Sequence, residues 1–347
     1  MSERASMDSL PPTETLELEN GLTLVPRVKL NLTIYPNPTT ASITMSKPVD
    51  EWKLKLALID FMKTSLTVSI TVPEEDLEIR RLGDLKKRKR DDPVAQGSLV
   101  IRDLGFLNKT TFNHNLDEEE DVKVLEKKYL DWRNYVLEKM DGMDLNLEGV
   151  KYKLNVAVSA SDDFDAMKKA WEEFYAFGNR GNSRSGKQEP NTIVVRGVPS
   201  LWFSEPLVSS KASTIVSHTI FSRLGNIRNI NAAEDNDLGK EAEETLSIVS
   251  GLNCKIVIQF ETYGDFCNAL KVLCGRSLQK QGSRLKADYE VTWDKDIYFR
   301  NSRSNTQDRT SRMPEMAAGK YRSEAPKRQQ QTARFSPDDA RRKRFKD

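Results

Sequence analysis

Polar and apolar residues alternate in the second half of the chain in a way that predicts an α+β domain. A period of two is typical of strands, and apolar residues spaced three and four apart are typical of helices. The predicted strands are Thr192–Val198, Ile227–Ala232, Cys254–Phe260 and Tyr289–Trp293. The predicted helices are Val208–Leu224 and Tyr263–Cys274. The order along the chain is therefore βαββαβ.

The first half carries a weaker copy of the same pattern. Its predicted strands are Val28–Tyr35, Ser65–Val72 and Tyr152–Val158, with either Leu77–Leu82 or Leu99–Leu107 as a further strand. Its predicted helices are Pro48–Met62 and Val122–Met140, followed by an additional helix at Asp162–Phe177. The apolar stripe of the Val122–Met140 helix suits core packing better than a partner surface, because the helix lies inside the domain.

These patterns divide the chain into two predicted domains with disordered ends. Residues 18–177 form a degenerate domain with a charged insertion near 86–97, and residues 191–299 form the second domain. Residues 178–190 are rich in Gly, Ser and Arg and predict a flexible linker. We expect residues 1–17 and the basic segment 300–347 to be disordered.

The βαββαβ order predicts a ferredoxin-like fold of the kind found in RNA-recognition-motif domains, and we expect both halves to have it. Such domains stack two or three bases on aromatic side chains of the central strands. The matching positions here are Val194, Lys255 and Val257, so no ring stands at the stacking positions. Base stacking contributes about 1–3 kcal/mol per base, and its absence predicts weak binding.

Alternation places five side chains on the open face of this sheet. They are Val194, Arg196, Lys255, Val257 and Gln259. We take Arg196, Lys255 and Gln259 as candidate RNA contacts. An ordinary solvated face that binds protein or nothing explains the pattern equally well. Trp202 is a further candidate if it is exposed, although an aromatic pair beside a proline favours burial.

Charge is distributed unevenly along the 347 residues. The whole chain has a formal net charge of +2, yet residues 300–347 contain 14 Lys+Arg against 6 Asp+Glu. That segment therefore carries +8, and the remainder carries about −6. A basic polar tail attracts phosphate without sequence preference. The acidic run Glu234–Glu244 between the second and third strands instead repels phosphate.

The residues that carry most enzyme chemistry are scarce. The chain has two histidines and three cysteines, and Cys254, Cys267 and Cys274 lack the spacing of a metal site. We expect buried reduced thiols, no metal or other cofactor, and no enzymatic activity. No apolar run approaches the length that spans a membrane, so we expect no membrane association and no secretion.

Three short motifs resemble the A-kinase anchor protein 17A-like family. They are Pro190–Ile193, Gly197–Phe203 and Phe221–Asn229, and Asn20–Pro26 also resembles the start of those proteins. The resemblance implies an RNA-recognition-motif domain, a role in pre-mRNA splicing in nuclear speckles, and splicing factors as partners. It also implies anchoring of the protein kinase A regulatory subunit. That property resides in helices after the domain, and Arg300–Asp347 has no sustained apolar stripe, so anchoring is doubtful.

The sequence thus predicts a nuclear RNA-associated protein that regulates pre-mRNA splicing or RNA processing, with weak, salt-dependent RNA binding. The alternative is an adaptor or scaffold that binds protein partners without RNA. Two basic clusters are typical of nuclear import signals. They are Lys86, Lys87, Arg88, Lys89 and Arg90, and then Arg341, Arg342, Lys343 and Arg344.

Overall fold

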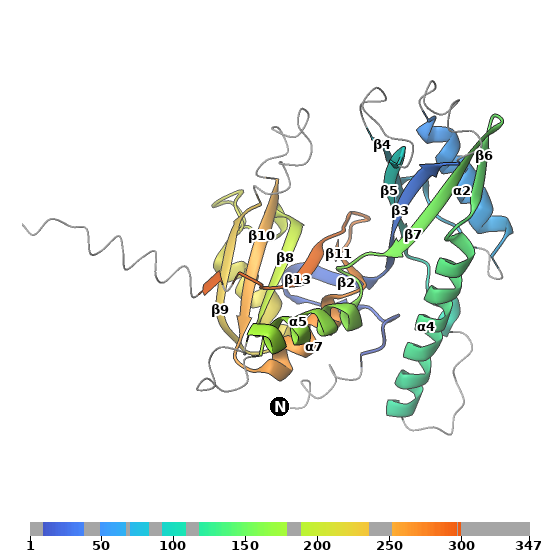
Figure 1. The fold of residues 1–347 in the computed structure, drawn as a ribbon. Coiled ribbons are helices and arrows are strands. Elements are labelled where there is room, and N and C mark those ends of the chain that lie inside the picture. The colour runs from blue at the N-terminus through green and yellow to red at the C-terminus, as the bar shows by residue number, and fades with distance from the viewer. Residues whose placement is uncertain are drawn as a thin grey trace, which may run out of the picture. The chain divides into compact units, whose positions relative to one another are not determined.

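The computed structural model describes residues 10–37, 49–66, 70–82, 92–108, 118–178, 189–235, 252–296 and 298–299. The chain divides into two compact units, Met1–Asn301 and Ser302–Asp347, and every described residue belongs to the first. Within it, three antiparallel sheets and several helices give the α+β class that the sequence predicts (Figure 1).

A five-stranded sheet with the order β4-β5-β3-β7-β6 occupies the first half. Its strands are β3 (Val28–Pro36), β4 (Leu77–Arg81), β5 (Ala95–Ile101), β6 (Asp144–Leu147) and β7 (Val150–Val158). Helices α2 (Glu51–Thr64) and α4 (Glu118–Met140) share one hydrophobic core with this sheet. The Asp50 carboxylate begins α2 by accepting hydrogen bonds from two backbone amides of its first turn, as an N-cap does.

A four-stranded sheet with the order β13-β8-β10-β9 occupies the second half. Its strands are β8 (Thr192–Pro199), β9 (Ile227–Glu234), β10 (Asn253–Phe260) and β13 (Glu290–Trp293). Its helices are α6 (Thr214–Phe221) and α7 (Tyr263–Leu273), and the preceding helix α5 (Phe164–Gly178) packs with them. Figure 1 shows α5 beside α7, where the rings of Trp171 and Phe266 lie 5.4 Å apart.

A third sheet joins segments from the two ends of the described chain. It contains β1 (Leu16–Glu17), β2 (Leu22–Pro26), β11 (Arg276–Lys280) and β12 (Lys286–Ala287) in that order. Leu18, Leu22 and Leu24 consequently pack in the core of the second half, as do Met167 and Trp171 of α5. The domain boundaries stay a prediction, but both ends of residues 18–177 contribute to the second core.

The strand predicted at Ser65–Val72 is wrong for its described residues, because 65–66 and 70–72 lie in no strand. Ile70 and Val72 are buried in the first core from an unpaired stretch of chain. The sheet instead uses both of the alternative segments, as β4 and β5. The helix predicted at Val208–Leu224 is also too long, since the Ser213 hydroxyl caps α6 at its Thr214 start.

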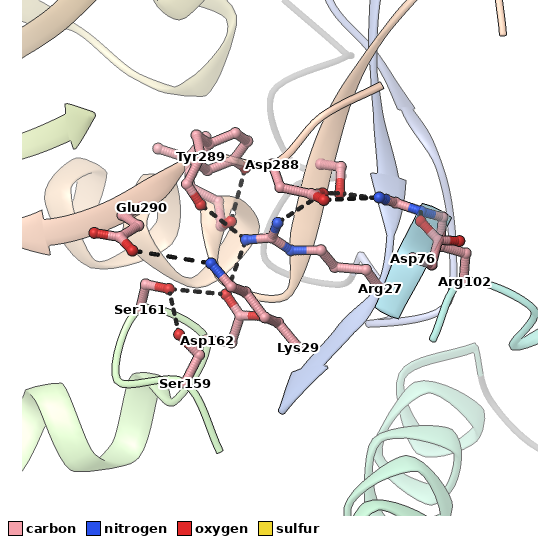
Figure 2. Close-up of polar contacts among 12 residues, drawn as sticks. Arg27, Lys29, Asp76, Arg102, Ser159, Ser161, Asp162, Asp288, Tyr289 and Glu290 are labelled. Atoms are coloured by element: carbon pink, nitrogen blue, oxygen red, sulfur yellow. Dashed lines mark hydrogen bonds and ion pairs between the residues drawn. The ribbon is translucent and has the colours of Figure 1, made fainter. Parts of the chain in front are cut away.

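A buried ion-pair cluster lies where β2 ends and β3 begins (Figure 2). Arg27 separates the two strands, and its side chain is 1% exposed. Its guanidinium pairs with Asp162 at 3.2 Å and with Asp288 at 2.8 Å, and it donates a 2.8 Å hydrogen bond to the Tyr289 carbonyl. The Arg27 amide also donates to the Gly275 carbonyl. One residue therefore contacts the segment between β7 and α5 and the residues that directly precede β11 and β13.

Arg102 extends this cluster from the end of β5. It pairs with Asp76 at 2.8 Å and with Asp288 at 2.7 Å, and it donates to the Ser277 hydroxyl. Burial alone would raise the pKa of Asp288. The hydrogen bond from Arg102 and the charge of Arg27 outweigh burial and hold that pKa well below its usual range. Asp288 is therefore charged wherever the protein is folded near neutral pH.

We predict that Arg27→Ala lowers the free energy of unfolding by about 3–5 kcal/mol, because it leaves two carboxylates without their buried partner. Urea denaturation at neutral pH measures the loss. Lys29→Ala is the matched control, since its 3.9 Å pair with the exposed Glu290 should contribute less than about 1 kcal/mol. An Arg27→Ala protein as stable as the Lys29→Ala protein would contradict the structural role of the cluster.

The lowered pKa of Asp288 also predicts a dependence of stability on pH. A carboxyl group whose folded pKa is depressed stabilises the fold above its unfolded pKa of about 4, and this contribution is lost as the pH falls toward the folded value. Asp288→Asn should therefore cost stability at pH 7, and the gap to wild type should shrink between about pH 5 and pH 2. Urea denaturation of both proteins at several pH values measures this difference in stability. A difference that does not change with pH would refute the lowered pKa of Asp288.

Candidate nucleic-acid interface

The face of the four-stranded sheet that lies opposite its helices carries the predicted RNA contacts. Ile193, Val195, Ile256 and Ile258 are fully buried on the helix side. The intervening residues of β8 and β10 therefore lie on the other face, as alternation predicts. Arg196, Lys255 and Gln259 are half-buried there, so the structure brings three of the four candidate contacts onto one surface.

A β-bulge in β8 places Arg196 next to Lys255. Cys254 pairs with Val198 and Ile256 pairs with Val195, so two β8 residues oppose Lys255 alone. Gly197 takes the left-handed conformation (φ 76°) that this extra residue requires, and glycine adopts it without steric cost. The bulge thus gathers two cationic side chains at one end of the face, a suitable place for a phosphate group.

Amide side chains line the opposite end of the face. Gln259 accepts a 2.6 Å hydrogen bond from Asn229 of β9 and donates a 3.3 Å bond to Asn191. Carboxamides carry both donors and acceptors and can bond to the edges of nucleobases. The face therefore combines cations for phosphate with amides for base edges, and its strands contribute no ring.

Val194 and Val257 differ from their predicted exposure. The sequence places them on the open face, yet they are 6% and 1% exposed. They are paired neighbours at the centre of the sheet, with Asn231 of β9 on the far side of Val257. The centre of the face is therefore covered rather than open to solvent.

Trp202 lies away from this surface. It ends the short η5 helix (Ser200–Trp202) beyond β8 and is half-buried against the second core, and its neighbour Phe203 is fully buried. The sequence favours burial of this aromatic pair, and the structure shows it in full for Phe203 and in part for Trp202. The candidate role of Trp202 in binding RNA stays a prediction without support from its position.

Acidic side chains border the basic end of the face. Glu290 of β13 is the strand partner of Arg196, and Glu234 at the end of β9 pairs with Lys211 at 2.8 Å. The remainder of the acidic run Glu234–Glu244, from residue 236 onward, lies outside the described residues, as do both predicted import clusters. Glu290 and Glu234 repel phosphate and narrow the region where a strand of RNA can bind.

Buried thiols and carboxylates are the other groups with site chemistry in the part of the chain that the structure describes. Burial raises the pKa of Cys254 to about 12, which keeps the thiol protonated and unreactive. Across the described ranges, no three His, Cys, Asp or Glu side chains are placed to hold a metal ion. No described helix is both long and apolar enough to cross a lipid bilayer.

Sequence reasoning missed Asn229 and Asn231 as part of this surface. Both lie in β9, whose alternation is weak because Ile230 and Ala232 are only partly buried. Their polar side chains at alternate positions of a predicted strand were the available signal. Adding them makes the candidate interface a surface of three adjacent strands.

Two comparisons relate the chain to known proteins. A model of the family described as AKAP-17A-like, RNA-binding domain, matches residues 125–334, a range that contains the four-stranded sheet and its polar face. The A-kinase anchor protein 17A of Homo sapiens is 24% identical over 233 residues, which is 65% of this chain and 32% of that relative. The aligned part thus spans about a third of the length of the relative.

Proposed function

The chain belongs to the AKAP-17A-like RNA-binding domain family, and we propose from this that it is an RNA-associated protein of the nucleus that regulates pre-mRNA splicing or RNA processing. One observation supports this proposal most strongly. The range that matches the family model includes a sheet face that presents Arg196, Lys255, Asn229 and Gln259 together. The proposal assigns no catalytic step to the chain.

Both halves are proposed to be RNA-recognition-motif-like domains. In the second half, the strand order β13-β8-β10-β9 places the first and third strands at the centre. In the first half, β3 and β5 are likewise central neighbours, and β6 is an additional edge strand. The central pair is where such domains bind single strands.

Affinity for RNA is proposed to divide unequally between the sheet and the tail. The strands present no ring on this face, and acidic residues border it, so its attraction for RNA is modest. Residues 300–347 carry a net charge of +8 by sequence. Contacts between such a segment and phosphates supply affinity that is independent of sequence and falls with salt.

We predict that deleting residues 300–347 weakens binding to a mixed-sequence single-stranded RNA more than Arg196→Ala combined with Lys255→Ala does. Each phosphate contact contributes a slope of about −0.7 to the logarithmic salt dependence, so the deletion should also flatten that dependence. Fluorescence anisotropy at two salt concentrations measures both effects. A larger loss in the double mutant would assign binding to the sheet, and absence of binding in wild type would refute the proposal.

Nuclear localisation is proposed from the two basic clusters. A fluorescent fusion in which Lys86–Arg90 and Arg341–Arg344 are changed to alanine should lose its nuclear enrichment, because import receptors recognise clustered Lys and Arg. The control changes Arg303, Arg309, Arg312 and Arg322, which are dispersed along the tail. Equal nuclear enrichment of the cluster variant and wild type would contradict the assignment.

A protein-binding adaptor is the second candidate function. Leu201, Leu207, Val208 and Ile215 are strongly exposed around the loop between β8 and α6, and exposed apolar side chains favour protein contacts. The predicted apolar stripe of α4 offers less, because Tyr129 and Val136 are buried in the first core. The relative is named a kinase anchor, and we extend no kinase anchoring to this chain.

A further inference from the structure

The chain crosses the candidate interface after its last strand. β13 and β9 are the two edges of the four-stranded sheet, and β8 and β10 lie between them. Yet Tyr298, five residues beyond Trp293, accepts a 2.6 Å hydrogen bond on its hydroxyl from the Asn231 side chain of β9. Figure 1 shows the chain passing from β13 to β9. Residues 294–296, 298 and 299 are called the strap below.

Hydrogen bonds at its start direct the strap over the sheet. The Asp294 amide donates to the Thr192 carbonyl at 3.0 Å, which anchors the strap beside β8. The Asp294 carboxylate accepts from the amide of Asp296 at 3.1 Å and from the amide of Tyr298 at 2.7 Å. This turn fixes the direction of the chain, and the ring of Phe299 packs edge-on against Tyr298 at 5.2 Å.

The two valines at the centre of the sheet are buried in the same row as Asn231. Val257 pairs with Val194 on one side and with Asn231 on the other. Tyr298 is bonded to Asn231, so it is anchored in this same row of the sheet. Val257 and Val194 are 1% and 6% exposed, so the row of the sheet that ends in Asn231 is buried at its centre.

The strap thereby places a flat ring at a position where RNA-recognition-motif domains hold a base. Like a base, Tyr298 combines an apolar ring with a polar edge, and a carboxamide of the sheet binds that edge. Val194 and Val257 stand where the stacking side chains of such domains stand. A base and Tyr298 cannot occupy this place together.

We propose that Tyr298 occupies a nucleobase site formed by Val194, Val257 and Asn231, and that single-stranded RNA binds the sheet when the strap is displaced. The inference rests on the proposed function. It adds a defined base site for which Tyr298 competes with RNA. The apparent affinity of the sheet is then the intrinsic affinity reduced by the fraction of molecules whose strap is open. Weakening the strap raises that fraction.

The experiment compares RNA affinity of the full chain for wild type, Tyr298→Phe and Tyr298→Ala. Tyr298→Phe loses one hydrogen bond and should bind roughly 2- to 10-fold more tightly, and Tyr298→Ala should gain more because the ring is also lost. Tyr263→Phe in α7, which packs on the helix side of the sheet, is the control and should leave affinity unchanged. The gain should persist at high salt, because contacts of a base with two valines and a carboxamide neutralise no phosphate and so release few counterions.

A second measurement follows the strap itself. The Tyr298 amide is bonded to Asp294 in the closed strap, so its hydrogen exchange should accelerate when a mixed-sequence RNA binds the wild-type chain. Protection that is unchanged or increased by bound RNA would overturn the displacement.

The possible outcomes separate this inference from the function on which it rests. Weaker binding by Tyr298→Ala would make Tyr298 a stacking platform and overturn the competition. Unchanged affinity in both Tyr298 variants would overturn the base site while leaving RNA binding by the chain intact. Absence of RNA binding in every variant would refute the proposed function and the inference together.

Discussion

The buried charge of Arg27 is the constraint on which the described fold depends. The chain passes from the third sheet into the five-stranded sheet at this residue, and the guanidinium is 1% exposed. A charge that has left water is stable only beside opposite charge with good geometry. Asp162, 135 residues away in the sequence, supplies one negative charge, and Asp288, two residues before β13, supplies the other. The two cores must therefore form next to this cluster.

The cluster also positions the candidate interface. The Tyr289 carbonyl accepts from Arg27 one residue before β13, and Asp288 is held by both Arg27 and Arg102. β13 is the edge strand from which the strap departs, so its position determines where Tyr298 crosses the sheet. The edge strand, the basic bulge and the strap together form the face on which we propose that RNA binds.

Periodicity predicted the elements whose burial has a regular pattern. Along β8 and β10, successive side chains lie on opposite faces except at the β8 bulge, and the candidate contacts Arg196, Lys255 and Gln259 fall on one face as expected. Ser65–Val72 failed because Ile70 and Val72 fill the core without pairing in a sheet. Val194 and Val257 were placed on the correct face, but alternation within strands carries no information about a segment that later crosses them.

Long-range partners were beyond the reach of the sequence patterns. An arginine between two strands resembles a surface residue, and nothing local indicates that Asp162 and Asp288 enclose Arg27. Tyr298 follows the last predicted strand, where an isolated aromatic residue has no periodic context. Its role depends on Asn231, which is 67 residues away. Such contacts become visible only when the strand order is known.

Native-state hydrogen exchange tests the central claim most directly. It compares the amides of Leu32 in β3 and Ile258 in β10, which report on the first and second cores. If the Arg27 cluster joins the cores, both amides should open with the same free energy in wild type and with different free energies after Arg27→Ala. Different opening free energies already in wild type, unaltered by the substitution, would contradict the account.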